Sequence, residues 1–175
     1  MNYLFGLTTA LKIVFAMSLL SMLTALFVRL VYEFERGVLF QNGKFKKVVD
    51  PGIVFLVPLL NQLDKVDMRE FEIEIPRIYV VMKDAKLLAV EIHASFQVSD
   101  AAKAVIETQD YYETAKMDTV MIVSDYLSQI TMDDMVKDLP AIKQKLREFA
   151  GRKLSFCGLR VVGLEINPVI THRSE

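Results

Sequence analysis

The sequence predicts an α+β protein in which an N-terminal apolar helix precedes a domain with a twisted, mostly antiparallel sheet and packed helices. Three observations predict this fold class. Residues 13–28 carry no charge, as expected of a membrane-spanning helix. Alternating apolar and polar residues, typical of half-buried strands, follow in the middle of the chain. Helix-start signals then run from Ser99 to Pro140, before one last apolar run.

The composition excludes several classes of protein. The chain has 175 residues, 53% of them hydrophobic, which fits one domain with an appendage and argues against disorder. Lys12 and Arg29 are the only charged side chains before Glu33, so the remainder carries a net charge of −3. Because a mildly acidic domain binds polyanions poorly, nucleic acid is not an expected partner. A single cysteine, Cys157, excludes an internal disulfide.

The first apolar segment, residues 11–31, predicts a single transmembrane helix. About 20 apolar residues cross a hydrocarbon core of roughly 30 Å, and Lys12 and Arg29 can extend toward the headgroups as flanking cations. A cleaved signal peptide and a buried core helix are the alternatives. By the positive-inside rule, the excess of cations after the segment predicts that the C-terminal domain lies in the cytoplasm. The predicted bilayer contacts in this segment are Leu11, Val14, Phe15, Leu19, Leu20, Leu23, Leu26 and Phe27.

Two tight turns separate short strand-like runs after this anchor. Asn42-Gly43 lies between the runs 36–41 and 44–49 and is a strong signal for a type I′ hairpin. Residues 50–52, Asp-Pro-Gly, predict a second turn. The basic run over residues 44–47 either touches anionic headgroups or is an ordinary solvated hairpin tip.

An apolar run over residues 53–60, interrupted by Pro58, has two interpretations. It is either a buried strand that ends in a loop or an exposed loop that lies against the bilayer near the anchor. The second interpretation predicts six further bilayer contacts, namely Val54, Phe55, Leu56, Val57, Leu59 and Leu60.

Three later segments predict longer strands. Residues 71–75 and 88–98 alternate with a period of two, so each has one core face and one polar face. Pro76 either ends the first of these strands or places it at a sheet edge. Residues 159–166 predict the last strand of the chain.

Helices fill the interval between the second and third of these strands. Ser99-Asp100 is an N-cap pair for a short helix over residues 101–107, and a longer helix follows from Asp110 or Tyr111 to about Ile130.

Two more helices complete the prediction. Thr131 and Asp134 resemble a capping box that opens a short helix through Lys137. Pro140 suits the first residue of the last helix, which Gly158 terminates. This helix is predicted to bury Ile142, Leu146 and Phe149. It is predicted to expose Lys143, Lys145, Arg147 and Arg152.

No residue pattern predicts catalysis, a cofactor or a metal site. His93 lies on a polar strand face with Glu91 and Ser95, but the set lacks a nucleophile elbow and an oxyanion site. Cys157 has no base near it in sequence and is interpreted as a small buried filler. Asp133-Asp134 is interpreted as a pair of acids at a helix N-terminus.

The order of motifs after the anchor resembles the SPFH, or band 7, superfamily of stomatin, prohibitin, flotillin and HflK/HflC proteins, with stomatin-like slipins most similar. The family's opening hairpin corresponds to residues 32–38 and 42–44, its apolar loop to residues 51–58, and the strand that follows to residues 66–69. Later family motifs correspond to residues 82–84, 99–101, 110–111, 132–135 and 157–166. The resemblance covers about residues 31–168.

This resemblance implies a band 7 domain without catalytic activity, in a protein that assembles on membranes. It also implies that the apolar run 53–60 dips into the bilayer interface. Stomatin-like relatives continue into a coiled-coil helix, whereas this sequence has no heptads, so assembly would rest on contacts between domains. The membrane hairpin proline and lipidated cysteines of stomatin are absent from this sequence, and Phe156-Cys157 replaces the family's aromatic pair.

We therefore expect an anchor over residues 1–31, a band 7 domain over 32–170 and a flexible tail over 171–175. The expected function is a non-enzymatic scaffold in the membrane that associates laterally, organises microdomains and modulates integral membrane proteins. The expected partners are the lipid bilayer, other SPFH chains and an integral membrane protein or protease, with no small-molecule substrate. The predicted lateral contacts are Lys143, Arg147 and Arg152.

Two other functions compete with this expectation. The first is a small adaptor or regulator of a membrane AAA-type protease, acting in hetero-assembly with full-length SPFH relatives. The second is an anchored hydrolase that uses His93 or Cys157.

Overall fold

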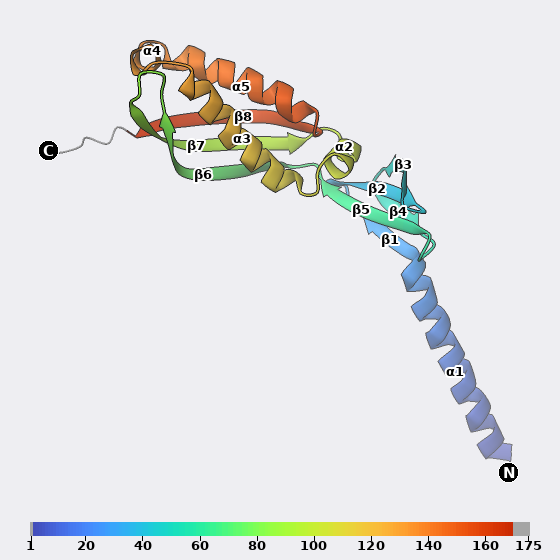
Figure 1. Ribbon diagram of the computed structural model, residues 1–175. Helices are drawn as coiled ribbons and strands as arrows, with labels where there is room; N and C mark the ends of the chain where they lie inside the picture. Colours follow the sequence, from blue (N-terminus) through green and yellow to red (C-terminus); the bar gives the residue numbers. More distant parts are fainter. Residues whose placement is uncertain (1, 170–175) are drawn as a thin grey trace. The chain divides into compact units, whose positions relative to one another are not determined.

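The computed structural model describes residues 2–169, apart from the side chains of residues 2–10 and 23–26. The predicted tail over 171–175 therefore lies outside the described residues. The chain divides into two compact units, an N-terminal unit (residues 1–65) and a C-terminal unit (residues 66–175). Figure 1 labels the helices and strands of both units.

The N-terminal unit begins with helix α1 (Asn2–Phe27) and strand β1 (Val28–Val31). β1 pairs antiparallel with β4 (Gly52–Phe55), with Val28 opposite Phe55 and Val31 opposite Gly52. The prediction of a helix through residue 31 is therefore wrong by four residues. β-Branched Val28 and Val31 favour extended backbone, and β4, distant in sequence, supplies their hydrogen-bond partners. Among the residues that the structure describes, no helix is both long and apolar enough to span a membrane.

A three-stranded sheet completes the N-terminal unit, in the order β3-β2-β5. Its strands are β2 (Glu35–Gln41), β3 (Lys44–Val49) and β5 (Asn61–Asp67). The predicted hairpin is confirmed, because β2 and β3 pair antiparallel and both turn residues, Asn42 and Gly43, have positive φ (51° and 74°).

The C-terminal unit is built on an antiparallel sheet in the order β6-β7-β8. Its strands are β6 (Glu70–Val81), β7 (Leu87–Val98) and β8 (Leu159–Val169). The predicted alternation in β7 is confirmed: Leu88, Val90, Ile92, Ala94, Phe96 and Val98 are all buried. Pro76 does not end its strand. β6 continues past it to Val81 as an edge strand, with a register irregularity between Ile75 and Ile78.

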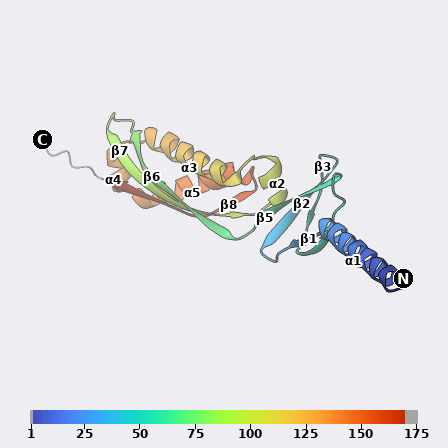
Figure 2. The same ribbon diagram turned by 90° about the horizontal axis from the view of Figure 1, so that it is seen from below.

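Helices cover one face of this sheet. α3 (Tyr111–Ser128) packs against β6 and against α5 (Leu139–Ser155), and α5 packs against β8 (Figures 1 and 2). Their inward side chains, including Val123, Leu127, Leu146 and Leu154, are 0% exposed and close the core over Phe96. The two layers, sheet and helices, leave the other sheet face open to solvent.

Two short helices connect these elements, and both have the predicted caps. Asp100 accepts from the Lys103 amide at the start of α2 (Ala101–Ile106). Thr131 and Asp134 form a capping box at the start of α4 (Met132–Lys137). In α5, however, Phe149 is 53% exposed rather than buried, because the inward stripe runs through Leu146, Ala150 and Leu154.

Gly158 joins α5 to β8 through a close backbone approach. Its φ is +72°, and a Cβ at this position would lie 2.4 Å from the Asp100 carbonyl oxygen. Its own carbonyl accepts hydrogen bonds from the Ser99 and Asp100 amides, at 2.8 and 3.1 Å. The glycine therefore holds the start of β8 against the end of β7, where α2 begins.

Candidate functional site

The connection between β4 and β5 carries an exposed group of apolar side chains, which we call the apolar tip. Its members Phe55, Val57, Leu59 and Leu60 are 77%, 47%, 104% and 51% exposed. Large exposed apolar side chains this close together in the chain make the tip a candidate for contact with a protein or a membrane. The tip therefore combines features of both sequence-based interpretations: Gly52–Phe55 is a strand, yet most of the run is exposed.

A strained turn presents the most exposed member of the tip. The Leu60 amide donates to the Val57 carbonyl at 3.2 Å, and Leu59 has φ +74°. With Pro58 in the second position, this is the geometry of a type II turn, in which glycine or asparagine normally occupies the Leu59 position. Left-handed backbone costs an ordinary residue about 1–2 kcal/mol. Because strained backbone clusters at functional sites, a leucine held there with its side chain in solvent is a candidate functional residue.

Two predicted bilayer contacts near the tip are not exposed in the same way. Leu56 is 7% exposed, and its amide donates to the Phe27 carbonyl at 2.8 Å. Val54 is half-buried. Leu56 therefore belongs to the small core of the N-terminal unit, since the alternation of an extended backbone turns it away from Phe55 and Val57.

The predicted contacts on α1 are exposed wherever their side chains are described. Leu11, Val14, Phe15, Leu19, Leu20 and Phe27 are between 37% and 73% exposed. Leu23 and Leu26 lie outside the described side chains. The flanking cations Lys12 and Arg29 are also exposed.

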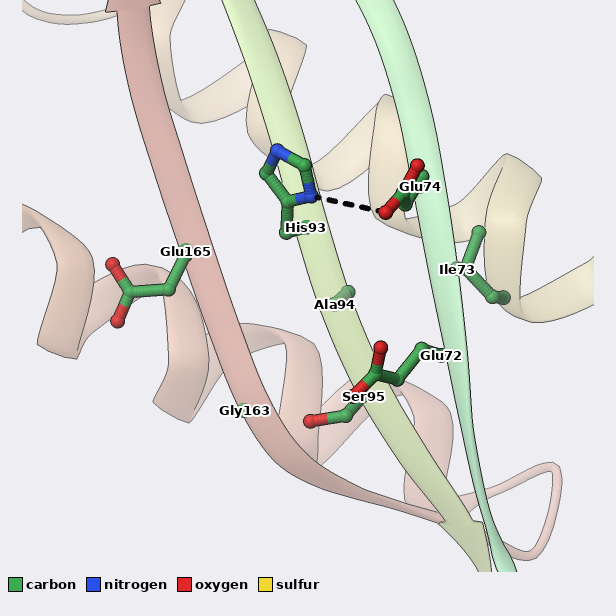
Figure 3. Close-up of a pocket in the computed structure, with 8 residues that line it drawn as sticks. All are labelled: Glu72, Ile73, Glu74, His93, Ala94, Ser95, Gly163 and Glu165. Atoms are coloured by element: carbon green, nitrogen blue, oxygen red, sulfur yellow. Dashed lines mark ion pairs between the residues drawn. The ribbon is translucent and has the colours of Figure 1, made fainter.

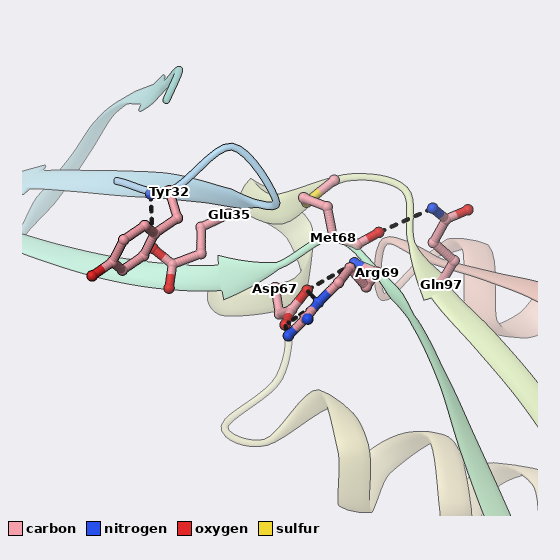
Figure 4. Close-up of polar contacts among 6 residues, drawn as sticks. All are labelled: Tyr32, Glu35, Asp67, Met68, Arg69 and Gln97. Atoms are coloured by element: carbon pink, nitrogen blue, oxygen red, sulfur yellow. Dashed lines mark hydrogen bonds and ion pairs between the residues drawn. The ribbon is translucent and has the colours of Figure 1, made fainter. Parts of the chain in front are cut away.

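A polar and aromatic cluster supports the corner between β1 and β2. Glu35 accepts a hydrogen bond from the Tyr32 amide at 3.1 Å (Figure 4). Glu35 also pairs with Lys65 of β5 at 3.1 Å. The Lys65 ammonium lies 5.0 Å from the centre of the Tyr32 ring, which stacks on Phe34. This cluster ties the segment after β1 to strand β5 of the three-stranded sheet.

The open sheet face of the C-terminal unit contains a pocket of about 160 Å³, lined by Glu72, Ile73, Glu74, His93, Ala94, Ser95, Gly163 and Glu165. The His93 Nδ1 atom lies 4.0 Å from Glu74, whereas Glu165 points away from His93 (Figure 3). Glu165 instead pairs with Lys143 at 2.6 Å.

The set of His93, Glu91 and Ser95 considered from the sequence is not assembled for catalysis. Glu91 pairs with Arg77 at 3.1 Å rather than with His93. The Ser95 side chain lies over Gly163, on the adjacent strand β8. Burial raises the pKa of the Cys157 thiol, and the nearby Asp118 and Glu107 carboxylates raise it further, which is opposite to what a thiolate nucleophile needs. Within the described residues, no group of three potential ligands could hold a metal ion.

The three cations predicted for lateral contact already have partners within the chain. Lys143 pairs with Glu165, Arg147 donates to the Val162 carbonyl, and the Arg152 guanidinium lies 5.4 Å from the centre of the Phe149 ring. Sequence periodicity places these side chains on one helix but carries no information about β8, which supplies two of the partners.

Hydrogen bonds among Asp67, Met68, Arg69 and Gln97, which we call the clamp, lie at the start of the C-terminal unit. The clamp was not identified from the sequence. Asp67 accepts from the Arg69 amide at 2.9 Å and from its Nε at 3.0 Å, and Gln97 donates to the Met68 carbonyl at 3.0 Å (Figure 4). The hydrogen bonds from Arg69 lower the pKa of the Asp67 carboxyl. The Val-Asp-Met-Arg motif thus fixes the chain where it enters β6.

Comparisons with known proteins match this arrangement to one family. The model of the SPFH domain / Band 7 family matches residues 30–172. A protein of Archaeoglobus fulgidus is 32% identical over 81% of this chain and 57% of its own length. Stomatin-4 of Caenorhabditis elegans is 26% identical over 81% of this chain and 51% of its own length. A stomatin homolog of Pyrococcus horikoshii is 23% identical over 81% and 53%. The chain thus spans about half the length of these curated relatives.

Proposed function

Since the chain belongs to the SPFH domain / Band 7 family, we propose that it is a non-enzymatic membrane scaffold that associates laterally and modulates integral membrane proteins. The observation that carries the proposal is the apolar tip, in which Leu59 is 104% exposed on a left-handed backbone. Exposed apolar side chains gain free energy by entering a bilayer interface, at roughly 25 cal/mol per Å² of buried apolar surface.

The proposal gives the N-terminal unit the membrane-binding role. The apolar side chains of α1 attach the chain to the bilayer, and the apolar tip enters the same leaflet. The cations Lys12 and Arg29 extend toward headgroups. The C-terminal unit then stands on the cytoplasmic side, where its open sheet face and helical face are available to neighbouring chains.

The remaining functional details belong to the same proposal. Organisation of microdomains would follow from many copies binding one patch of bilayer. Modulation of a membrane protein, including a AAA-type protease, would follow from contact with the cytoplasmic unit. Among the relatives, one is named stomatin-4, others are named stomatin homologs, and one, 27% identical, is named mechanosensory protein 2.

A depth-sensitive probe tests the membrane role of the tip independently of α1. Leu59→Cys, in a Cys157→Ser background, carries a fluorophore, and the full chain is reconstituted into vesicles with quenching groups on the acyl chains. We expect strong quenching at position 59. Val136→Cys is the matched control, because Val136 is 76% exposed but lies on α4 of the C-terminal unit. Equal, weak quenching at both positions would refute insertion of the tip.

A further inference from the structure

Two edge strands of this chain carry opposite charge. β3 is the end strand of the sheet β3-β2-β5, and β6 is the end strand of β6-β7-β8. Lys44, Lys46 and Lys47 of β3 are all exposed, and β3 contains no acid; we call these three the basic edge. Glu70, Glu72 and Glu74 of β6 are all exposed, and β6 contains no cation before Arg77; we call these the acidic edge.

Charges on edge strands commonly prevent one sheet from pairing with another. Because β3 is basic and β6 is acidic, their charges prevent pairing only between edges of like charge. Two basic edges repel each other, and so do two acidic edges, because like charges facing each other are destabilising. A basic edge and an acidic edge attract. Both symmetric dimers through these edges are therefore disfavoured, and the head-to-tail contact is favoured.

We propose that the basic edge of one copy of this chain docks on the acidic edge of a second copy. This inference rests on the lateral association proposed above and assigns its surfaces. The register shift of the β2–β3 pair between Leu39 and Phe40 interrupts regular pairing along β3. The contact is therefore made by charged side chains rather than by a continuous backbone ladder.

The two edges belong to different sheets, so each copy offers one basic edge and one acidic edge. Where the two edges of a copy bind two different neighbours, this head-to-tail contact builds a closed ring or an open chain of copies. Because exposed ion pairs are screened by salt, the assembly is expected to dissociate as ionic strength rises.

Charge reversal tests the contact in the full chain, purified in detergent, by light scattering. The acid-reversed variant is Glu72→Lys/Glu74→Lys, which makes both edges basic. The base-reversed variant is Lys44→Glu/Lys46→Glu, which makes both edges acidic. We expect each variant alone to lose the wild-type assembly, with the association weakened about tenfold or more. An equimolar mixture of the two variants is expected to assemble again, because each acidic edge then meets a basic edge on another chain.

Matched controls change the same net charge away from both edges. Asp125→Lys/Glu148→Lys and Lys137→Glu/Lys145→Glu alter exposed positions on the helices of the C-terminal unit, and both are expected to keep the wild-type mass. Circular dichroism verifies that every variant is folded.

The remaining outcomes separate the two proposals. Wild-type chain that keeps the mass of a single copy refutes lateral association itself. Wild-type chain that assembles, with both reversed variants assembling equally well, leaves lateral association intact and overturns the edge contact. A base-reversed variant that assembles normally but no longer binds vesicles of phosphatidylserine assigns the lysines to headgroups and also overturns it.

Discussion

The two units of this chain differ in how far their apolar side chains are buried. In the N-terminal unit, the buried hydrophobic side chains among those described are Val31, Val38, Leu39 and Leu56, while the apolar tip is largely exposed. In the C-terminal unit, each strand of the sheet and each helix contributes side chains to one continuous core. The difference indicates that burial of apolar surface stabilises the C-terminal unit, whereas the exposed tip of the N-terminal unit is the candidate contact with an external partner.

Truncation of a core residue should break the C-terminal unit and leave the N-terminal unit intact. Phe96 is 0% exposed, and Phe96→Ala is expected to destabilise the C-terminal unit by about 3–5 kcal/mol, through lost burial and the cavity left behind. Hydrogen exchange of the β7 amides measures this loss. Faster exchange of β2 and β3 to the same extent would show that the two units unfold together.

Loss of a helix cap tests the C-terminal unit at its surface. The Asp134 amide donates to Thr131 Oγ1 at 3.2 Å, so Thr131→Ala leaves the first turn of α4 without its capping oxygen. We expect a loss of about 1 kcal/mol in the free energy of unfolding. Thr131→Ser is the control and is expected to retain most of the stability, because it keeps the hydroxyl. A similar loss in both variants would contradict the capping role.

Substitution in the apolar tip should lower membrane binding without lowering stability, unlike substitution of a core residue. Glycine adopts the left-handed backbone of position 59 without strain, and the Leu59 side chain contributes no burial. Leu59→Gly is therefore expected to leave stability unchanged or raise it by up to about 1 kcal/mol. Vesicle binding is expected to fall at the same time. Chemical denaturation and the quenching assay measure these two effects, and a clear loss of stability would place Leu59 in the fold rather than at the membrane.

The smallest expected effect concerns acid pH at the clamp. Arg69 lowers the pKa of Asp67 below its usual value near 3.8, so the ionised carboxyl favours the folded state. This stabilisation is complete above the usual pKa and is lost as the pH falls through the lower, folded-state pKa. Asp67→Asn is expected to be slightly less stable than wild type at neutral pH, with the difference vanishing in strong acid. A difference that persists there would assign it to lost packing.

The sequence was sufficient wherever the signal is local. The Asn42-Gly43 hairpin, the capping box at Thr131 and the alternation of β7 follow from turn chemistry, capping and side-chain period, which are properties of adjacent residues. The motif order from residue 32 onward likewise identified the family that the comparisons match.

Tertiary structure alone decided the features that depend on residues distant in sequence. Val28–Val31 is a strand because β4 pairs with it, although its composition continues the apolar helix. Phe149 is exposed and Ala150 buried because α5 turns its stripe toward β8 and α3. Lys143 is engaged because Glu165 of β8 lies beside it. Local pattern specifies the type of each element, whereas its boundaries, its buried face and its charge partners depend on which other element packs against it.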